Sequence, residues 1–271
     1  RMAGFYSIMP FIEQKPLYDT ITASGIEPWN NSDPYKQIVD VFNCPSDQQF
    51  GDLTGANPSR TRGMRNYMFC TGDSLNIGRI GETASTVEAN SIVPTRGAFA
   101  AMTTYAMRHL TDGTSNTVFL GERVRATAID TFGVVSEGTF ANPAACAPRL
   151  NKSTGAVTGG YEGDTMPGCR YLDGGEYFSG MNTILPPNSA SCFSNGTDGA
   201  HWRPGYFTAS SRHAGGAQVA MGDAKVAFIS ENIDAGSQAT SPPLATSAAA
   251  SPYGVWGALG TRDAGESARV P

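Results

Sequence analysis

The sequence is poor in charge, and this shortage narrows the functions to consider. Charged residues make up 16% of the 271 residues, the net charge is −5, and lysine and arginine form no cluster. A nucleic-acid-binding domain needs a basic face that neutralises phosphates, so this composition argues against a nucleic-acid partner. No stretch approaches the roughly eighteen consecutive apolar residues of a membrane-spanning helix, so none is predicted within this sequence.

Histidine is also scarce, which limits the options for hydrolytic catalysis. The three histidines are His109, His201 and His213. A catalytic triad needs a histidine beside a nucleophile and a carboxylate, and Ser211 and Asp223 lie near His213 in sequence. However, the Gly-x-Ser-x-Gly turn of the α/β-hydrolases is absent. We therefore predict a protein that is not an enzyme, in which His213 ties a loop to the sheet; an envelope hydrolase centred on His213 is a third hypothesis.

The five cysteines include no Cys-x-x-Cys pair, and their spacing matches no zinc signature. They are Cys44, Cys70, Cys146, Cys169 and Cys192. Most lie in turn-like settings, such as Cys44 before Pro45, which favours disulfides and an oxidising compartment. The sequence leaves the pairing open; Cys44 with Cys70 is the first choice because it closes the shortest loop that they can share. An odd number leaves at least one thiol unpaired.

Glycine, by contrast, is abundant, with 32 residues, and one hairpin stands out among the loops that it favours. Two apolar runs, 217–221 and 226–229, flank the turn-forming segment 222–225, which contains Asp223. Gly215 and Gly216 precede the first run and can take the positive φ that a sharp bend requires. We expect this hairpin at the centre of the sheet. The alternating residues expected on its buried face are Val219, Met221, Val226 and Phe228.

The remaining pattern predicts an α+β fold, with an antiparallel sheet, short N-terminal helices and long Gly/Pro-rich loops. Apolar residues at helical spacing, interrupted by proline, predict two short helices within residues 4–23, and a third is predicted over residues 34–42. The further predicted strands are 66–70, 97–101 and 117–124.

The chain, 1–271, is predicted to form a single domain. Residues 125–200 form a loop-rich insertion with short strands, which disulfides or ions would make rigid. Residues 235–252 are rich in serine, alanine, threonine and proline and predict a flexible surface loop. The segment 253–266, which contains Trp256, is expected to dock back on the domain.

One turn offers oxygen ligands for a hard cation. Asp112 and Asn116 bracket an Asp-Gly-Thr-Ser-Asn turn, and Glu122 ends the strand that follows. These three residues are candidate ligands for Ca²⁺, although the twelve-residue EF-hand spacing is absent. The alternative is turn capping and surface charge. No other cofactor is predicted.

Six stretches of the sequence fall in order into one pattern. They are Met9–Gln14 with Leu17-Tyr18, Cys44–Asp47, Thr111–Thr117 with Leu120–Glu122, Asn182–Ser189 with Ser191-Cys192, Ser211–His213 with Gly215-Gly216 and Met221–Asp223, and Trp256–Arg262. Together they closely resemble the planctomycete DUF1559 family of pilin-like proteins. One departure is that Asp223-Ala224-Lys225-Val226 stands where the family has Asp-Gly-Ser-Val, which indicates a wider turn. Structural roles are assigned to Cys44, Cys70, Cys169, Cys192, His213, Gly215, Gly216 and Asp223.

The resemblance implies an exported structural protein of the cell envelope or the extracellular space. Family members begin with a prepilin-type segment and a long hydrophobic helix, which would be missing here. The sequence would then be the globular head of a type IV pilin-like or type II secretion pseudopilin-like subunit. It would form a homo-oligomer or filament through that helix, which would also be its membrane contact. The alternative is an extracellular solute- or glycan-binding module that uses residues 125–200. Trp202, Tyr206 and Phe207 could line a sugar or peptide groove, but packing in the core or at an interface is the preferred interpretation of these three residues.

Overall fold

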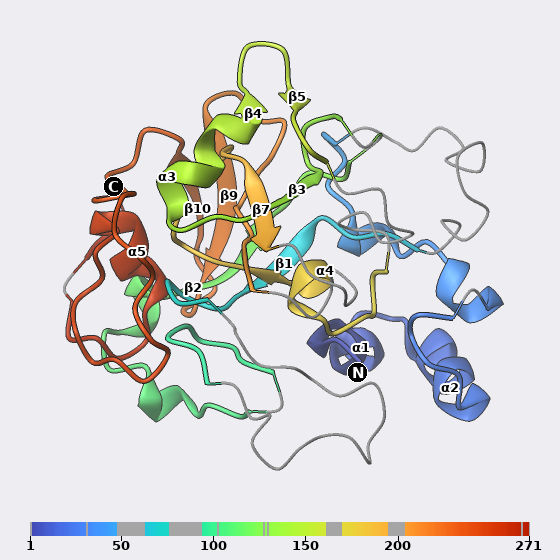
Figure 1. The fold of residues 1–271 in the computed structure, drawn as a ribbon. Helices are drawn as coiled ribbons and strands as arrows, with labels where there is room; N and C mark the ends of the chain where they lie inside the picture. The colour runs from blue at the N-terminus through green and yellow to red at the C-terminus, as the bar shows by residue number, and fades with distance from the viewer. Residues whose placement is uncertain are drawn as a thin grey trace.

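One sheet of five strands organises the described residues, and a three-stranded sheet and a two-stranded ribbon lie beside it (Figure 1). The computed structural model describes residues 2–30, 32–47, 63–75, 94–101, 103–126, 128, 130–160, 170–194, 204–266 and 268–270. Short helices combine with mainly antiparallel strands, which confirms the predicted α+β class.

Most elements are short, as expected for a chain so rich in glycine and proline. The α-helices are α1 (Gly4–Ile8), α2 (Lys15–Ser24), α3 (Pro143–Cys146), α4 (Glu176–Ser179) and α5 (Gly254–Gly260). The 3-10 helices are η1 (Met9–Phe11), η2 (Asp33–Lys36), η3 (Asp40–Phe42), η6 (Met107–His109), η7 (Thr114–Asn116) and η8 (Ala147–Arg149). The strands are β1 (Tyr67–Cys70), β2 (Val118–Glu122), β3 (Val135–Gly138), β4 (Leu150–Asn151), β5 (Ala156–Val157), β6 (Gly180–Met181), β7 (Ser191–Ser194), β8 (Gly205–Tyr206), β9 (Gly216–Met221) and β10 (Val226–Ser230).

The two predicted N-terminal helices form as α1 and α2. Gly25 ends α2 with a φ of 61°, a left-handed conformation that glycine adopts without strain. The single helix predicted over 34–42 is wrong, because Gln37 and Val39 are extended and separate η2 from η3. The β-branched Ile38 and Val39 favour extended backbone, which explains the break.

Two of the predicted strands form as β1 and β2, but the strand predicted at 97–101 is wrong. Ala100 instead makes an isolated bridge with Thr103. The guanidinium of Arg262 donates hydrogen bonds to the carbonyls of Thr95 and Gly97. The carbonyls of Thr95 and Gly97 therefore accept hydrogen bonds from the C-terminal segment and not from a neighbouring strand.

The β9–β10 hairpin lies at the edge of the main sheet, not at its centre as the sequence predicts. The strand order is β10-β9-β2-β1-β6, so β9 lies between β10 and β2. All pairings in this sheet are antiparallel except β1 with β6. In the turn, Asp223 Oδ1 accepts a hydrogen bond of 3.0 Å from the Lys225 N–H, and Ala224 has a φ of 68°. An alanine therefore occupies the left-handed position that glycine would adopt more easily.

The buried face of the hairpin also differs from the prediction. Val219 and Met221 are buried as expected, but Val226 and Phe228 are 65% and 44% exposed. Val219 is paired with Ala227, and residues opposite each other in antiparallel strands share a face. The buried face of β10 is therefore formed by Ala227 and Ile229.

The main sheet is covered on both faces. Met68 and Cys70 of β1 belong to the same core cluster as Trp256 of α5. The alternating residues of β1, such as Phe69, pack against the cluster of the N-terminal helices, which includes Phe5. In Figure 1, α5 lies at the left of the picture, whereas α1 and α2 lie at the lower right.

The C-terminal segment docks on the domain, as the sequence predicts. Trp256 is fully buried, and its Nε1 donates a hydrogen bond of 2.8 Å to the Leu185 carbonyl. The preceding loop, 235–252, is irregular, but it is attached near both ends. Ser237 N donates to the Pro252 carbonyl at 3.0 Å. The Gln238 side chain donates to the Ile184 carbonyl, also at 3.0 Å.

One disulfide joins Cys146 of α3 to Cys192 of β7, which confirms that disulfides are present. The predicted Cys44–Cys70 pair is wrong, because both residues are buried free thiols. Cys70 belongs to the core cluster that contains Trp256 of α5, whereas Cys44 contacts His213. The length of the loop between two cysteines therefore does not predict which of them form the disulfide. Cys169 lies outside the described residues.

The described parts of the segment 125–200 are joined closely to the rest of the fold. They contribute β6 to the main sheet and both β3 and β7 to the three-stranded sheet. Among the described residues, no helix has the length and apolar character that crossing a bilayer would require.

Candidate functional site

Three side chains from distant parts of the sequence, Cys44, Glu122 and His213, meet at the end of β2. One potential ligand atom of each lies within 4.8 Å of the other two. His213 Nε2 is 3.3 Å from Glu122 Oε1 and 3.8 Å from Cys44 Sγ. The same ring nitrogen therefore faces both the carboxylate and the thiol.

Each of these residues is fixed by a main-chain or side-chain hydrogen bond. The Cys44 N–H donates to Asn66 Oδ1 at 2.8 Å. The second carboxylate oxygen of Glu122 accepts a 2.8 Å hydrogen bond from the Gln218 N–H of β9, which holds the carboxylate in place. The loop before β9 carries His213, whose N–H donates to the Ser211 hydroxyl at 3.0 Å.

A buried carboxylate, Asp47, joins the same segments beside the site. Its Oδ2 accepts hydrogen bonds from Asn66 Nδ2 at 2.6 Å and from the N–H and Nε of Arg125 at 3.0 and 3.1 Å. Its Oδ1 accepts from Arg212 Nε at 2.8 Å. Burial alone would raise the pKa of Asp47, but these hydrogen bonds outweigh it and hold the pKa below its ordinary value. The hydrogen bonds of Asp47 thus connect the segments next to Cys44, Glu122 and His213.

The arrangement differs from that of a catalytic relay. In such a relay, a nucleophile and a carboxylate engage opposite nitrogens of the imidazole. Here Cys44 and Glu122 both approach Nε2 of His213. Burial raises the pKa of the Cys44 thiol, and the negative charge of Glu122 raises it further, which opposes formation of a nucleophilic thiolate. Donors that converge on one point are instead typical of a metal centre.

The residues of the hydrolase hypothesis do not come together. The Ser211 hydroxyl donates a 2.7 Å hydrogen bond to the Gly216 carbonyl and accepts one from the His213 N–H. Asp223 lies in the hairpin turn at the far end of β9. The carboxylate beside His213 is that of Glu122, which sequence proximity did not indicate.

Of the three calcium candidates, Asp112 and Asn116 lie together, but Glu122 lies apart from them. The Asp112 carboxylate accepts hydrogen bonds from the N–H groups of Ala264 and Gly265, at 2.9 and 2.8 Å. Asn116 donates its side-chain N–H to the Asp112 carbonyl at 2.9 Å. Glu122 lies at the opposite end of β2. The turn therefore ties the C-terminal segment to the sheet.

The other residues singled out in the sequence have identifiable places. Gly215 has a φ of 82°, as expected for the bend before β9, and a Cβ on Gly216 would lie 2.1 Å from the Ile229 carbonyl. Tyr206 and Phe207 are buried in core clusters, which confirms core packing, the preferred interpretation, over a groove. His201 and Trp202 lie outside the described residues.

These features define a disulfide-containing α+β domain with a Cys–Glu–His constellation at a sheet end. Residues 2–236 match the family described as "Protein of unknown function (DUF1559)". The match covers most of the chain, which therefore belongs to the DUF1559 family. No curated protein and no solved structure shows significant similarity to it.

Proposed function

We propose that the chain is a non-enzymatic structural subunit, the head of a pilin-like or pseudopilin-like protein that assembles with copies of itself. The observation that carries this proposal is an apolar surface on the N-terminal layer. This layer consists of residues 2–47, which contain α1, α2, η2 and η3. Phe11 and Ile38 are 85% and 75% exposed there. The exposed large apolar side chains of residues 2–47, here called the N-terminal apolar surface, are Ile8, Phe11, Ile26, Ile38 and Val41.

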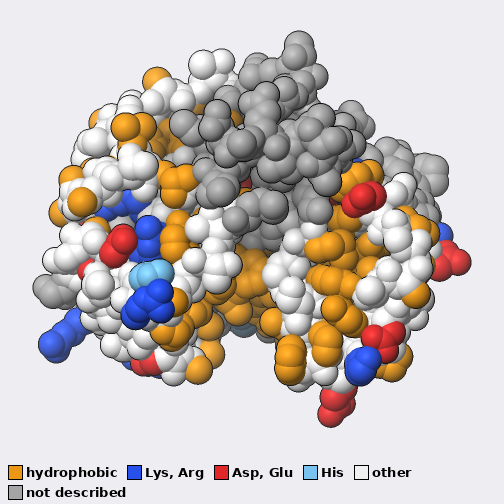
Figure 2. All heavy atoms as spheres, turned by 90° about the horizontal axis from the view of Figure 1, so that it is seen from below, with side chains coloured by type: hydrophobic (Ala, Val, Ile, Leu, Met, Phe, Trp, Pro, Cys, Tyr) orange, Lys and Arg blue, Asp and Glu red, His pale blue; other side chains and the backbone are white. Residues whose placement is uncertain are grey.

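Exposed apolar side chains that gather in one region favour protein contact over solvent. Figure 2 shows the molecule from below, and many hydrophobic side chains lie on the right half of this view. Helix α2 lies on the same side of the molecule in Figure 1. The Lys15–Asp19 and Lys36–Asp33 ion pairs, at 2.7 and 2.8 Å, neutralise charges in the same segments. These pairs reduce the unbalanced charge that a second copy would meet on approach.

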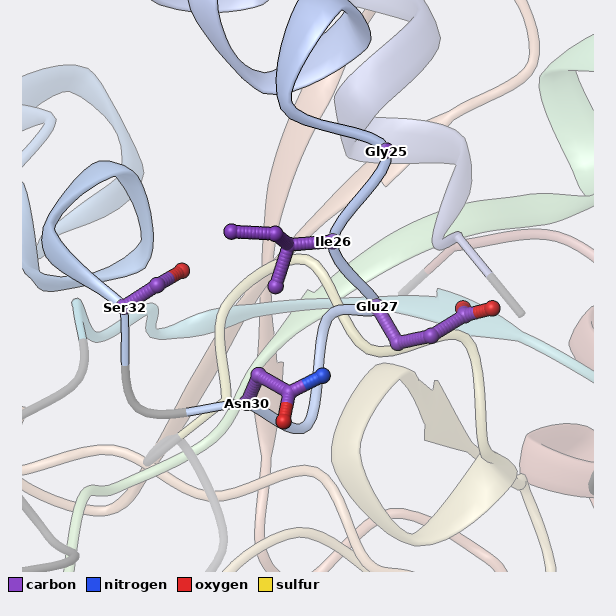
Figure 3. A pocket seen from close by; sticks show the side chains of 5 residues that line it. All are labelled: Gly25, Ile26, Glu27, Asn30 and Ser32. Carbon is purple, nitrogen blue, oxygen red and sulfur yellow. The ribbon is translucent and has the colours of Figure 1, made fainter.

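Two pockets lie along the same N-terminal layer. One is lined by Gly25, Ile26, Glu27, Asn30 and Ser32, and the other includes Leu17 and Ile38. In Figure 3, the side chains of Ile26 and Ser32 point into the first pocket from two sides, whereas Glu27 extends away. This mixed lining suits a protruding side chain of a neighbouring copy better than a charged solute.

Two further features support an exported assembly protein. The Cys146–Cys192 disulfide favours an oxidising compartment, such as the cell envelope or the extracellular space. In pilin-like proteins the assembly helix precedes the head. The N-terminal layer, which begins with α1, would then lie next to that helix and to neighbouring subunits.

The proposal is tested by substituting polar residues on the N-terminal apolar surface. We expect the Phe11→Ser/Ile38→Ser double variant to weaken self-association at least tenfold in sedimentation velocity over a range of concentrations. Full-length protein in native envelope preparations should appear in filaments or other repeating structures by electron microscopy. The matched control is Leu244→Ser, because Leu244 is 70% exposed but lies outside this surface.

A different result would favour the binding alternative. If the full-length protein occurred only as a monomer with a small molecule in a closed pocket, the structural proposal would be wrong and a solute- or glycan-binding module would replace it. Equal self-association of the double variant and the wild type would show that the N-terminal apolar surface is not the contact.

A further inference from the structure

We propose that Cys44, Glu122 and His213 bind one divalent transition-metal ion, with Zn²⁺ as the best fit. A tetrahedral zinc ion with ligands at about 2.0–2.3 Å places a nitrogen and an oxygen ligand about 3.3 Å apart. The same geometry places a nitrogen and a sulfur ligand about 3.6 Å apart. The observed separations from His213 Nε2 are 3.3 Å to Glu122 and 3.8 Å to Cys44.

The donor set selects the class of metal. A thiolate, an imidazole and a carboxylate suit borderline-soft ions such as Zn²⁺, whereas Ca²⁺ and Mg²⁺ prefer several oxygen ligands. Binding would displace the thiol proton of Cys44 to solvent. The thiolate and the Glu122 carboxylate would then balance the two charges of the ion, while His213 binds as the neutral imidazole.

The surroundings hold the three donors in a converging arrangement. Glu122 Oε2 is occupied by the Gln218 N–H, which leaves Oε1 to face His213. The Cys44 backbone is held by Asn66, which Asp47 holds in turn. Outer hydrogen bonds of this kind orient metal ligands and reduce the cost of organising them.

The burial of the donors indicates an accessible fourth position. Cys44 is 8% exposed, and the side chains of Glu122 and His213 are 6% and 31% exposed. The site is therefore sheltered on the sheet side and open beside the imidazole. Three protein ligands leave one coordination position of a tetrahedral ion for water or for a donor from a bound molecule.

A bound ion would join three segments that are distant in sequence. Cys44 lies in the turn after η3, Glu122 ends β2, and His213 precedes β9. An ion that binds only the folded chain should raise the unfolding temperature by roughly 5 °C when free zinc is a hundredfold above Kd. This role is independent of the assembly proposed above.

The test uses the full chain, stripped of metal with a chelator and titrated with Zn²⁺ by calorimetry. We expect one ion per chain. Co²⁺ should give the near-ultraviolet charge-transfer band of a thiolate ligand, and X-ray absorption of the zinc form should show one sulfur ligand among nitrogen and oxygen ligands. Cys44→Ser, Glu122→Gln and His213→Gln should each weaken zinc binding at least about a hundredfold. Cys70→Ser and His109→Gln, which alter a free thiol and a histidine outside the site, should bind as the wild type does.

Failure of any variant to fold is detected by its unfolding temperature in chelator. In that case, the sulfur ligand and the cobalt band of the wild type decide the question without the variant. The proposal is overturned if the wild type binds no ion, if the bound ion has no sulfur ligand, or if Cys44→Ser folds and binds zinc as tightly as the wild type.

Discussion

Ile229 and Phe228 are neighbours on β10, yet Ile229 is 1% exposed and Phe228 is 44% exposed. The two side chains point to opposite faces of the sheet because successive strand residues alternate. The face of Ile229 packs against Met68 of β1 and Trp256 of α5 in one cluster. The smaller residue of this pair therefore carries more of the packing.

The first prediction compares these two residues. Ile229→Ala should lower the free energy of unfolding by about 2–5 kcal/mol, because it leaves a cavity in the core. Phe228→Ala is the matched control and should cost less, about 1 kcal/mol or below, since much of its ring is already in solvent. Denaturant unfolding measures both values. A larger loss for Phe228→Ala would contradict the observed register.

The second prediction concerns the disulfide. Cys146 and Cys192 are separated by 46 residues, and closing a loop of that length stabilises a protein by about 4 kcal/mol in the chain-entropy treatment. We expect the Cys146→Ser/Cys192→Ser variant to lose roughly 2–4 kcal/mol. Alkylation of the unfolded, unreduced wild type followed by peptide mapping should label Cys44 and Cys70 but leave Cys146 and Cys192 unlabelled. A Cys44–Cys70 linkage in that map would contradict the structure.

The third prediction concerns Asp47. Asp47→Ala removes the carboxylate that contacts both Arg125 and Arg212 in a largely buried setting, and it should cost about 3–5 kcal/mol. The matched control is Asp19→Ala, which breaks the exposed Lys15–Asp19 pair and should cost less than about 1 kcal/mol. Thermal unfolding of the two variants at neutral pH tests this difference; equal losses would show that burial of the Asp47 pair adds nothing.

Asp47 also predicts a dependence on acid. Its pKa is lowered in the folded protein, so its contribution to stability is present above the ordinary carboxylate pKa. That contribution should be lost as the pH falls through the lowered pKa. The stability difference between wild type and Asp47→Ala should therefore shrink in strong acid, as measured by denaturant unfolding across the acidic range.

The fourth prediction concerns Glu176 and has the opposite sign. Desolvation raises the pKa of Glu176 from 4.5 to about 8, against the lowering effects of the Thr71 hydrogen bond and the charge of Arg123. The folded protein then binds this proton more tightly than the unfolded chain does. The contribution of Glu176 to stability should fall as the pH rises from about 4.5 to about 8 and change little above that.

Glu176→Gln removes this ionisation while keeping the shape of the side chain. We expect the variant to gain roughly 1 kcal/mol or more relative to the wild type between pH 5 and pH 8. The exposed Glu27→Gln should not change the pH profile in the same way. Parallel profiles for Glu176→Gln and the wild type would mean that Glu176 is already ionised in the folded state at pH 5.

The sequence predicted the elements whose signals are local. Proline and helical spacing predicted α1 and α2, and alternation next to turn residues predicted β1, β2 and both strands of the hairpin. The buried face of the hairpin was predicted incorrectly, because it depends on how the four-residue turn sets the register of Ala227 against Val219.

The candidate site depends on relationships that no local pattern contains. Proximity in sequence groups Glu122 with Asp112 in one predicted cation site, but Asp112 precedes β2 and Glu122 ends it. The order β9-β2-β1 brings Glu122 near the loop that carries His213, and the turn of Cys44 joins them through Asn66. Only the long-range pairing of strands could have shown that Cys44 is a partner of His213 and not of Cys70.

The position of α5 has a consequence for how the protein is made. Trp256 and Leu259 complete the core on one face of the main sheet, and the Arg262 N–H donates to the Arg96 carbonyl at 3.0 Å. A ribosome adds these residues after every strand of that sheet. The growing chain therefore lacks the cover of this face until synthesis has passed residue 262, so the apolar side chains of the face stay exposed until then.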